Sequence, residues 1–200
     1  SRIPCYRLAG DRCHAIRGST RCHAVNSADT APALMALNAR LRIMREGRSR
    51  EIAIRDFYND DGARHIMLEP GELVTEVYIP AAGPGSRCVF MKECVRRGVD
   101  FATGAIAVFM KQSDGVCAEP YLVLNAFGSA PLVLQKTAAL LQYEKLTDEL
   151  IDEAAHIAPT ELGTLTNLFT LAGYKRALAQ ALVRKALAAH KTMFPKTGRA

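Results

Sequence analysis

The sequence predicts an α+β protein, because strand-like and helix-like patterns occupy different parts of the chain. Up to residue 126, several stretches alternate apolar and polar residues or are short and apolar, as is typical of strands. After residue 131 the apolar residues follow the helical period instead. The run Ala81-Ala82-Gly83-Pro84-Gly85 is the best candidate for a boundary. With 49% apolar residues among 200, the chain can bury a sizeable core in one large domain or two small ones.

The part before this boundary is expected to hold one helix and three strands. In order, these are a helix from residue 30 and strands at 39–44, 51–54 and 73–79. Asp29 or Thr30 caps the helix, and Pro32 lies in its first turn. Glu46-Gly47 turns the first strand into the second, which predicts a hairpin.

The part after the boundary is expected to form a small sheet followed by helices. The expected elements are strands at 87–94, 102–111 and 117–126, and helices at 132–143, 148–158 and 173–190. Ser113-Asp114-Gly115 joins the last two strands. The final helix is basic toward its C-terminal end, which suits the helix dipole.

The charge distribution and the absence of apolar runs exclude several classes of function. Residues 1–55 hold eleven arginines and four acids, which suggests nucleic acid, an anionic cofactor, a partner subunit or a solvated face. Because Tyr6 is the only aromatic residue before Phe57, we expect no nucleic-acid binding. No apolar run approaches the roughly 20 residues of a membrane span, and no signal-peptide pattern is visible. We therefore expect a cytoplasmic protein without disulfides.

Three cysteines in the irregular N-terminal segment form the sharpest motif. Their spacing is Cys5-x7-Cys13-x8-Cys22, in a stretch with almost no apolar pattern that would bury them. Thiolates are suited to Zn²⁺ or iron–sulfur clusters, which predicts a metal site. A [4Fe–4S] cluster normally takes four cysteines, so His14, His23 or a cysteine upstream of the chain would complete it. Unliganded thiols are the alternative.

No catalytic residue is expected in this chain. Its serines lack the nucleophile-elbow motif, and no nucleophile–base arrangement is evident. Neither the P-loop nor the Rossmann fingerprint occurs.

The stretch Val25–Leu34 resembles the Ser-Pro-x-x-Asp-x-x-Pro-x-Leu segment of the FAD-binding medium subunits of the xanthine oxidase (molybdenum hydroxylase) family. Further stretches that resemble the family follow in its order, at 68–80, 90–102, 127–131 and 173–187. The cysteine-rich segment is similar to an insertion in the β subunit of 4-hydroxybenzoyl-CoA reductase. The family's N-terminal phosphate-binding subdomain has no counterpart, so the chain resembles the C-terminal two-thirds of such a subunit.

The resemblance implies two domains. Residues 1–80 would be the C-terminal part of an α+β FAD-binding domain, with the cysteine-rich insertion at 1–24. Residues 86–192 would be a domain of the CO dehydrogenase flavoprotein C-terminal type, an antiparallel sheet with three helices.

The resemblance also implies roles for individual residues. Asp29 would face the ribityl or ribose hydroxyls of FAD, with helix capping as the alternative. Val74 would pack against the isoalloxazine, with ordinary sheet core as the alternative. Lys92 would stabilise the negative charge of reduced flavin, with an exposed edge-strand charge as the alternative. The three cysteines, Cys5, Cys13 and Cys22, match the last three of four ligands of an extra [4Fe–4S] cluster.

The implied function is electron relay within an oxidoreductase. The partners would be a molybdenum-cofactor large subunit, a [2Fe–2S] small subunit and a ferredoxin-type donor. The reaction implied by the cysteine insertion is the reductive dehydroxylation of 4-hydroxybenzoyl-CoA. One alternative is a xanthine, aldehyde or CO dehydrogenase-type hydroxylase of the same family. A non-catalytic assembly or zinc-binding module is the second.

Overall fold

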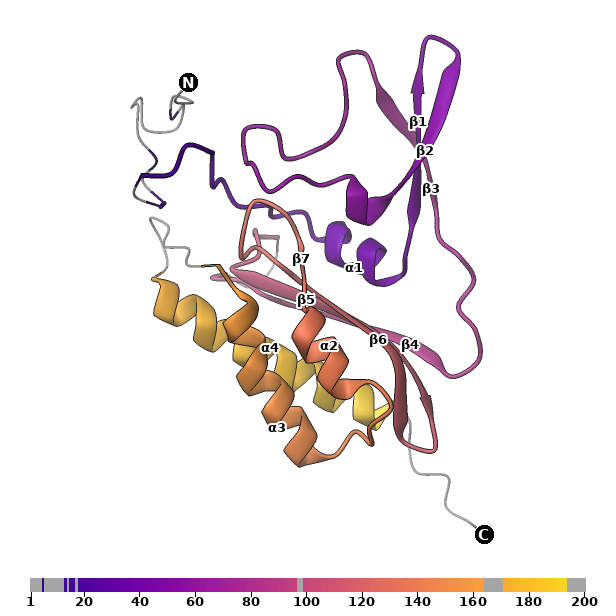
Figure 1. Cartoon of the computed structure of the whole chain (residues 1–200), viewed down its shortest axis with the longest axis vertical. Coiled ribbons are helices and arrows are strands. Elements are labelled where there is room, and N and C mark those ends of the chain that lie inside the picture. The colour runs from indigo at the N-terminus through magenta and orange to yellow at the C-terminus, as the bar shows by residue number, and fades with distance from the viewer. Residues whose placement is uncertain are drawn as a thin grey trace.

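The computed structural model describes residue 5, residue 13 and residues 15–16, 18–96, 99–163 and 171–193. These residues form two antiparallel sheets and four α-helices (Figure 1). The elements are α1 Thr30–Ala36, β1 Arg40–Arg45, β2 Arg48–Ala53, the 3₁₀-helix η1 Ile54–Asp56, β3 Leu73–Tyr78, β4 Ser86–Glu93, β5 Gly104–Ser113, β6 Val116–Asn125, β7 Leu132–Val133, α2 Gln135–Leu141, α3 Asp148–Ile157, the 3₁₀-helix η2 Ala158–Glu161 and α4 Ala172–Thr192. The predicted α+β class is confirmed.

The first sheet has three strands in the order β2-β1-β3. The predicted hairpin turn is confirmed, since Glu46 and Gly47 have φ angles of 49° and 77°. Two consecutive positive φ angles are typical of the type I′ turns whose twist matches that of antiparallel strands. Strand β3 pairs with β1 along one edge, with an irregularity between Arg42 and Ile43.

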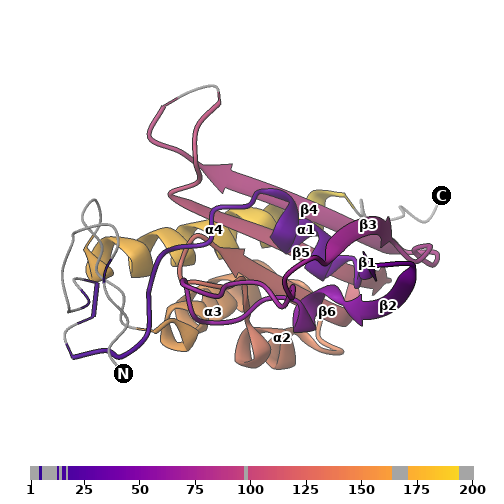
Figure 2. The ribbon, with the colours of Figure 1, turned by 90° about the horizontal axis from the view of Figure 1, so that it is seen from above.

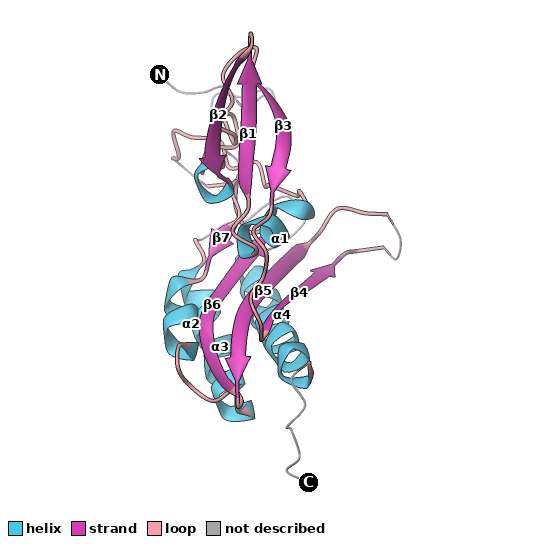
Figure 3. Ribbon diagram, turned by 90° about the vertical axis from the view of Figure 1, so that its right-hand side faces the viewer, coloured by secondary structure: helices cyan, strands magenta, loops and turns pink. Residues whose placement is uncertain are grey.

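The second sheet has four strands in the order β4-β5-β6-β7 and is covered on both faces. Helices α2, α3 and α4 lie on the face away from the three-stranded sheet (Figure 3). Helix α1 lies on the opposite face, over β5 and β6 (Figure 2). The expected antiparallel sheet with three helices is therefore present, and α1 links it to the first sheet.

Two apolar clusters fill these layers. The first lies between the four-stranded sheet and α2–α4, and includes the fully buried Ile106, Leu124 and Leu187. The second joins the two sheets, because Met35 of α1 and Ile43 of β1 belong to the same cluster as Val123 of β6. The two halves of the chain thus share buried apolar surface.

The expectation of one helix over residues 132–143 is wrong at its beginning. Leu132 and Val133 form β7 and pair with Leu124 and Val123 of β6, so α2 begins only at Gln135. The helical spacing of the leucines is real, but cross-strand pairing at the sheet edge determines the first residues of this stretch.

No helix in the described part of the chain is long and apolar enough to cross a membrane.

Candidate functional site

One row of side chains crosses the four-stranded sheet at the end where β4 and β6 finish and β5 begins. Lys92 of β4 pairs with Ala105 of β5, and Ala105 pairs with Asn125 of β6. Directly paired residues in antiparallel strands point to the same face of the sheet. Lys92 and Asn125 therefore flank the small Ala105 on the face that carries α1.

Asn125 fixes the segment that leads into α1. Its side chain is fully buried, and its Nδ2 donates to the carbonyl oxygen of Ala28 at 2.9 Å and to Oδ1 of Asn26 at 3.4 Å. The backbone N–H of Asn26 donates to the carbonyl of Gly128 at 2.9 Å. Oδ1 of Asn125 has no hydrogen-bond partner among the described residues. Asn125 thus binds the segment before α1 to the sheet, and its Oδ1 is a buried acceptor without a partner among the described residues.

Asp29 does not cap α1 with its side chain, although it occupies the N-cap position. Its Oδ2 instead accepts a hydrogen bond from Nζ of Lys92 at 2.6 Å. The prediction of side-chain capping by Asp29 is therefore wrong. The carboxylate is directed to the sheet because the ammonium on the edge strand lies within reach.

Lys92 is largely covered, although β4 is an edge strand. Its side chain is 20% exposed, whereas that of Asp29 is 47% exposed. The hydrogen bond with Asp29 raises the pKa of the Lys92 ammonium above its ordinary value. The alternative of a simple exposed edge-strand charge is therefore wrong, and the pair presents a half-exposed carboxylate beside a fixed cation.

Val74 lies in the other sheet, where it faces Ile43 of β1 and packs against the second apolar cluster. It is half-buried, so part of its surface remains open. The structure brings Asp29 and Lys92 together directly, but it places Val74 on a different element.

The three cysteines predicted as metal ligands lie apart from any metal-site arrangement among the described residues. Each is partly buried and none forms a disulfide. Sγ of Cys13 accepts from the Ile16 amide at 3.4 Å, and Sγ of Cys22 accepts from the Ala24 amide at 3.4 Å. Among the described residues, no group of three or more His, Cys, Asp or Glu side chains is arranged to hold a metal ion. Cys5, Cys13 and Cys22 are therefore not gathered into such a group in the part of the chain that the structure describes, and their role as cluster ligands stays a prediction.

The two candidate histidine ligands have different outcomes. His14 lies outside the described residues. Nε2 of His23 is 2.8 Å from Oγ of Ser19, and burial is the main cause that lowers the pKa of His23. His23 thus has a local partner of its own.

Lys175 was not identified by the sequence reasoning, although it belongs to the same end of the sheet. Nζ donates to the carbonyl oxygens of Thr103 at 2.5 Å and Ala126 at 2.6 Å, and it lies 5.1 Å from the centroid of the Phe127 ring. Burial lowers the pKa of Lys175 to about 8. The sequence pattern that could have identified Lys175 is its position one turn before Ala179, on the apolar face of the helix. The ends of β5 and β6 are therefore held from both faces.

Two family models match the chain. A model described as the FAD binding domain in molybdopterin dehydrogenase matches residues 14–82. A model described as the CO dehydrogenase flavoprotein C-terminal domain matches residues 90–190. The second match covers half of the chain.

Similar curated proteins include two named subunits of oxidoreductases. The carbon monoxide dehydrogenase medium chain of Afipia carboxidovorans is 29% identical over 157 residues, which cover 78% of this chain and 54% of the relative. The aldehyde oxidoreductase FAD-binding subunit of Escherichia coli is 31% identical over 195 residues, covering 90% of this chain and 58% of the relative. The chain thus spans a little over half the length of these relatives.

The fold is also similar to that of solved structures. The carbon monoxide dehydrogenase of Hydrogenophaga pseudoflava matches with a TM-score of 0.76 at 25% identity, covering 83% of this chain and 57% of that one. A Cu,Mo-CO dehydrogenase matches with a TM-score of 0.73 at 26% identity and the same coverage.

Proposed function

Because the chain belongs to the family of FAD-binding medium subunits of molybdenum hydroxylases, we propose that it forms part of an electron-relay subunit whose flavin lies beside the Asp29–Lys92 pair. The observation that carries the proposal is the 2.6 Å contact between these residues, which are 63 positions apart in the chain. A lone surface ion pair contributes little to stability. This pair, however, lies at the end of a sheet whose adjoining segments are fixed by Asn125 and Lys175.

The residues present fit the FAD that this family implies. The half-exposed carboxylate of Asp29 is able to accept hydrogen bonds from the ribityl or ribose hydroxyls while it keeps Lys92 in place. The open part of Val74 would pack against the ring system. Asn125 is fully buried, and its contribution is to hold the segment before α1 in place through the carbonyl of Ala28.

FAD, when bound, supplies the chemistry of accepting and releasing one or two electrons. The chain's own contribution would be electrostatic and positional. The fixed ammonium of Lys92 favours negative charge beside it, and its raised pKa keeps it protonated at neutral pH. Asp29 orients that ammonium. Neither residue transfers a proton in this proposal.

The family relationship supports a set of partners. The full subunit would assemble with a molybdenum-cofactor large subunit and a [2Fe–2S] small subunit, and would exchange electrons with them. The named relatives belong to a carbon monoxide dehydrogenase and an aldehyde oxidoreductase. They favour a molybdenum hydroxylase as the complex to which the full subunit belongs.

The narrower proposal is 4-hydroxybenzoyl-CoA reductase, with a ferredoxin-type donor and an extra [4Fe–4S] cluster. Its support is the spacing of Cys5, Cys13 and Cys22. Since these thiols are not gathered into a metal site within the described residues, no electron-transfer step is assigned to a cluster.

The test is to purify the full-length subunit under anaerobic conditions and record its absorption spectrum and iron content. Flavin bands are expected, and flavin without iron would support the hydroxylase type. About four irons per subunit in addition to flavin would support the narrower proposal. A subunit with neither flavin nor iron would contradict both the hydroxylase and the reductase proposals. A non-catalytic assembly module would then be the remaining explanation.

The role of Lys92 is tested by Lys92→Gln in the same subunit. Losing the cation is expected to lower the flavin midpoint potential, by roughly 30 mV for each 1.4 kcal/mol of lost stabilisation in a two-electron couple. The matched control is Lys185→Gln, because Lys185 forms a more exposed ion pair with Glu93 at the end of the same strand. Equal potentials in the two variants would exclude the proposed role of Lys92.

A further inference from the structure

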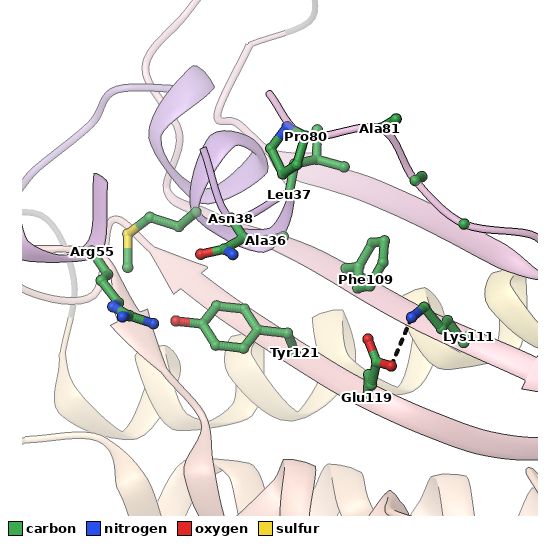
Figure 4. A pocket seen from close by; sticks show the side chains of 13 residues that line it. Ala36, Leu37, Asn38, Arg55, Pro80, Ala81, Phe109, Lys111, Glu119 and Tyr121 are labelled. Carbon is green, nitrogen blue, oxygen red and sulfur yellow. Dashed lines mark hydrogen bonds and ion pairs between the residues drawn. The ribbon is translucent and has the colours of Figure 1, made fainter. Parts of the chain in front are cut away.

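A pocket of about 350 Å³ lies on the face of the four-stranded sheet that carries α1, at the other end of α1 from Asp29 (Figure 4). One wall consists of the end of α1 and the residues that follow it, Met35 to Asn38. A second wall is the linker 80–83 between β3 and β4. Neither Asp29, Val74 nor Lys92 lines this pocket, so it is separate from the proposed flavin site.

The floor of the pocket is aromatic. Phe109 of β5 and Tyr121 of β6 are directly paired across the two strands, and both are half-buried. The buried Met35 and the half-buried Leu37 lie beside them. Paired rings flanked by apolar side chains favour a flat, ring-shaped occupant, because aromatic rings stack in offset or edge-to-face arrangements.

One end of the pocket is cationic. In Figure 4 the guanidinium of Arg55 and the hydroxyl of Tyr121 point toward one another. Among the described residues, the acid recorded near the guanidinium is Asp56, at the long distance of 3.9 Å. Burial raises the pKa of Tyr121, so its hydroxyl stays protonated at neutral pH and is able to donate. Arg55 thus keeps donor capacity for an anionic group.

The opposite end carries no net charge. Nζ of Lys111 and Oε1 of Glu119 form an ion pair at 2.7 Å, so these two groups satisfy each other. With Glu119 already paired, the pocket has no oxygen cluster suited to a divalent cation. Arg55 is therefore the unbalanced charge of the lining.

We propose that this pocket binds a planar aromatic anion, with the ring on Phe109 and Tyr121 and the acidic group on Arg55. Pockets that hold small molecules generally combine apolar and aromatic walls with a few convergent polar groups, and begin at about 300 Å³. The volume suits a molecule of one or two fused rings. An arginine fork recognises a carboxylate by paired, charge-assisted hydrogen bonds.

The neighbouring hollow is a poorer site for this ligand. It shares Met35, Arg55 and Tyr121 with the first pocket but is also lined by Asp56. A carboxylate on that side would repel an anion. The aromatic anion is therefore assigned to the first pocket.

The probe for the test is 2-naphthoate, titrated into the purified protein and followed by its own fluorescence. The chain has no tryptophan, so the emission is free of tryptophan background. We expect saturable binding that weakens about tenfold in Arg55→Gln. The matched control is Arg48→Gln, an exposed arginine on β2 that does not line the pocket, and its affinity should equal that of the parent protein.

A second variant tests the location without removing charge. Ala81 is exposed on the linker wall, so Ala81→Trp would fill the pocket from outside without disturbing the core. Binding to this variant is measured by equilibrium dialysis, because the new tryptophan emits; it should be lost while the far-ultraviolet circular dichroism spectrum is unchanged. The proposal is overturned if the parent protein does not bind 2-naphthoate at millimolar concentrations, if Arg55→Gln and Arg48→Gln bind it equally, or if Ala81→Trp, with an unchanged spectrum, binds it like the parent.

Discussion

Lys175 and Asn125 are buried polar side chains that bind the backbone on opposite faces of one sheet end. Lys175 donates to the carbonyls of Thr103 and Ala126, and Asn125 donates to that of Ala28. A buried polar group is tolerated only when it is hydrogen-bonded, so each side chain determines where its partner segment lies. At the residue scale, the candidate site is therefore positioned by groups that need not touch a cofactor.

Lys175→Met is expected to lower the free energy of unfolding by about 1–3 kcal/mol at pH 7, because the two carbonyls lose their donor. The deficit should widen as the pH rises from about 8 to 10.5. The pKa of Lys175 is about 8 in the folded protein and 10.5 in the unfolded protein. Between these values only the unfolded protein binds the proton, so the stability of the parent protein rises with pH. The neutral amine still donates to both carbonyls.

The measurement is urea unfolding followed by circular dichroism at several pH values. The control is Lys185→Met, which removes an exposed ion pair and should change the free energy by less than about 1 kcal/mol. A deficit that narrows above pH 8 would contradict the assigned role of burial.

At the scale of elements, Gly104 lets α4 approach the beginning of β5. A Cβ at this position would lie 2.8 Å from Cδ2 of Leu178, 2.9 Å from Cζ of Phe127 and 3.1 Å from Cδ1 of Leu182. Such distances are shorter than packed side chains allow, so these side-chain tips occupy the space directly over the glycine backbone. This contact brings Lys175, in the first turn of α4, to the strand ends.

Gly104→Ala is expected to destabilise the protein by about 1–3 kcal/mol through overpacking. Gly173→Ala is the matched control, because Gly173 lies in α4 with no atom near its missing Cβ. Alanine there should be neutral or stabilising by up to about 1 kcal/mol. Thermal unfolding of both variants checks the difference, and an equal melting temperature would contradict the close approach.

Most helices and strands were predicted correctly because turn residues and apolar spacing within each stretch of sequence determine them. The Glu46-Gly47 turn and the three C-terminal helices were found from turn residues and apolar spacing. Strand β7 was missed because two residues carry no periodicity, and only their pairing with β6 defines them. The side-chain cap of Asp29 was wrongly predicted for the same reason, since Lys92 is distant in sequence.

The residues of the site also differ in whether the sequence alone could identify them. Asp29 and Lys92 were selected through the resemblance to a family, and the structure brings them into contact. Their roles toward FAD, and that of Val74, remain predictions. Asn125 and Lys175 were missed because their importance arises from backbone carbonyls that the fold brings to them.

At the scale of the whole molecule, the second apolar cluster makes the two sheets one cooperative unit. Met35 is 5% exposed and belongs to a cluster with residues from β1 and β6. Apolar surface shared in this way links the stability of one sheet to that of the other.

Met35→Ala is expected to lower the free energy of unfolding by about 2–5 kcal/mol. Hydrogen exchange of β1 and β5 should accelerate together, because the cluster holds both sheets. Acceleration in one sheet alone would show that the halves unfold independently. Met67→Ala, which alters an exposed methionine, is the control and should leave exchange unchanged.

The position of β3 has a consequence for self-association. In the described part of the chain β3 pairs only with β1, and Leu73, Val77 and Tyr78 on it are exposed. An open strand edge with apolar side chains is a template for pairing with a second chain. Glu76 within the strand forms an ion pair with Arg42 of β1 at 2.8 Å and opposes such pairing, because an added strand would have to cover these charges. Replacing Glu76 by an apolar residue should therefore promote fibrous or amorphous aggregates that begin at this strand.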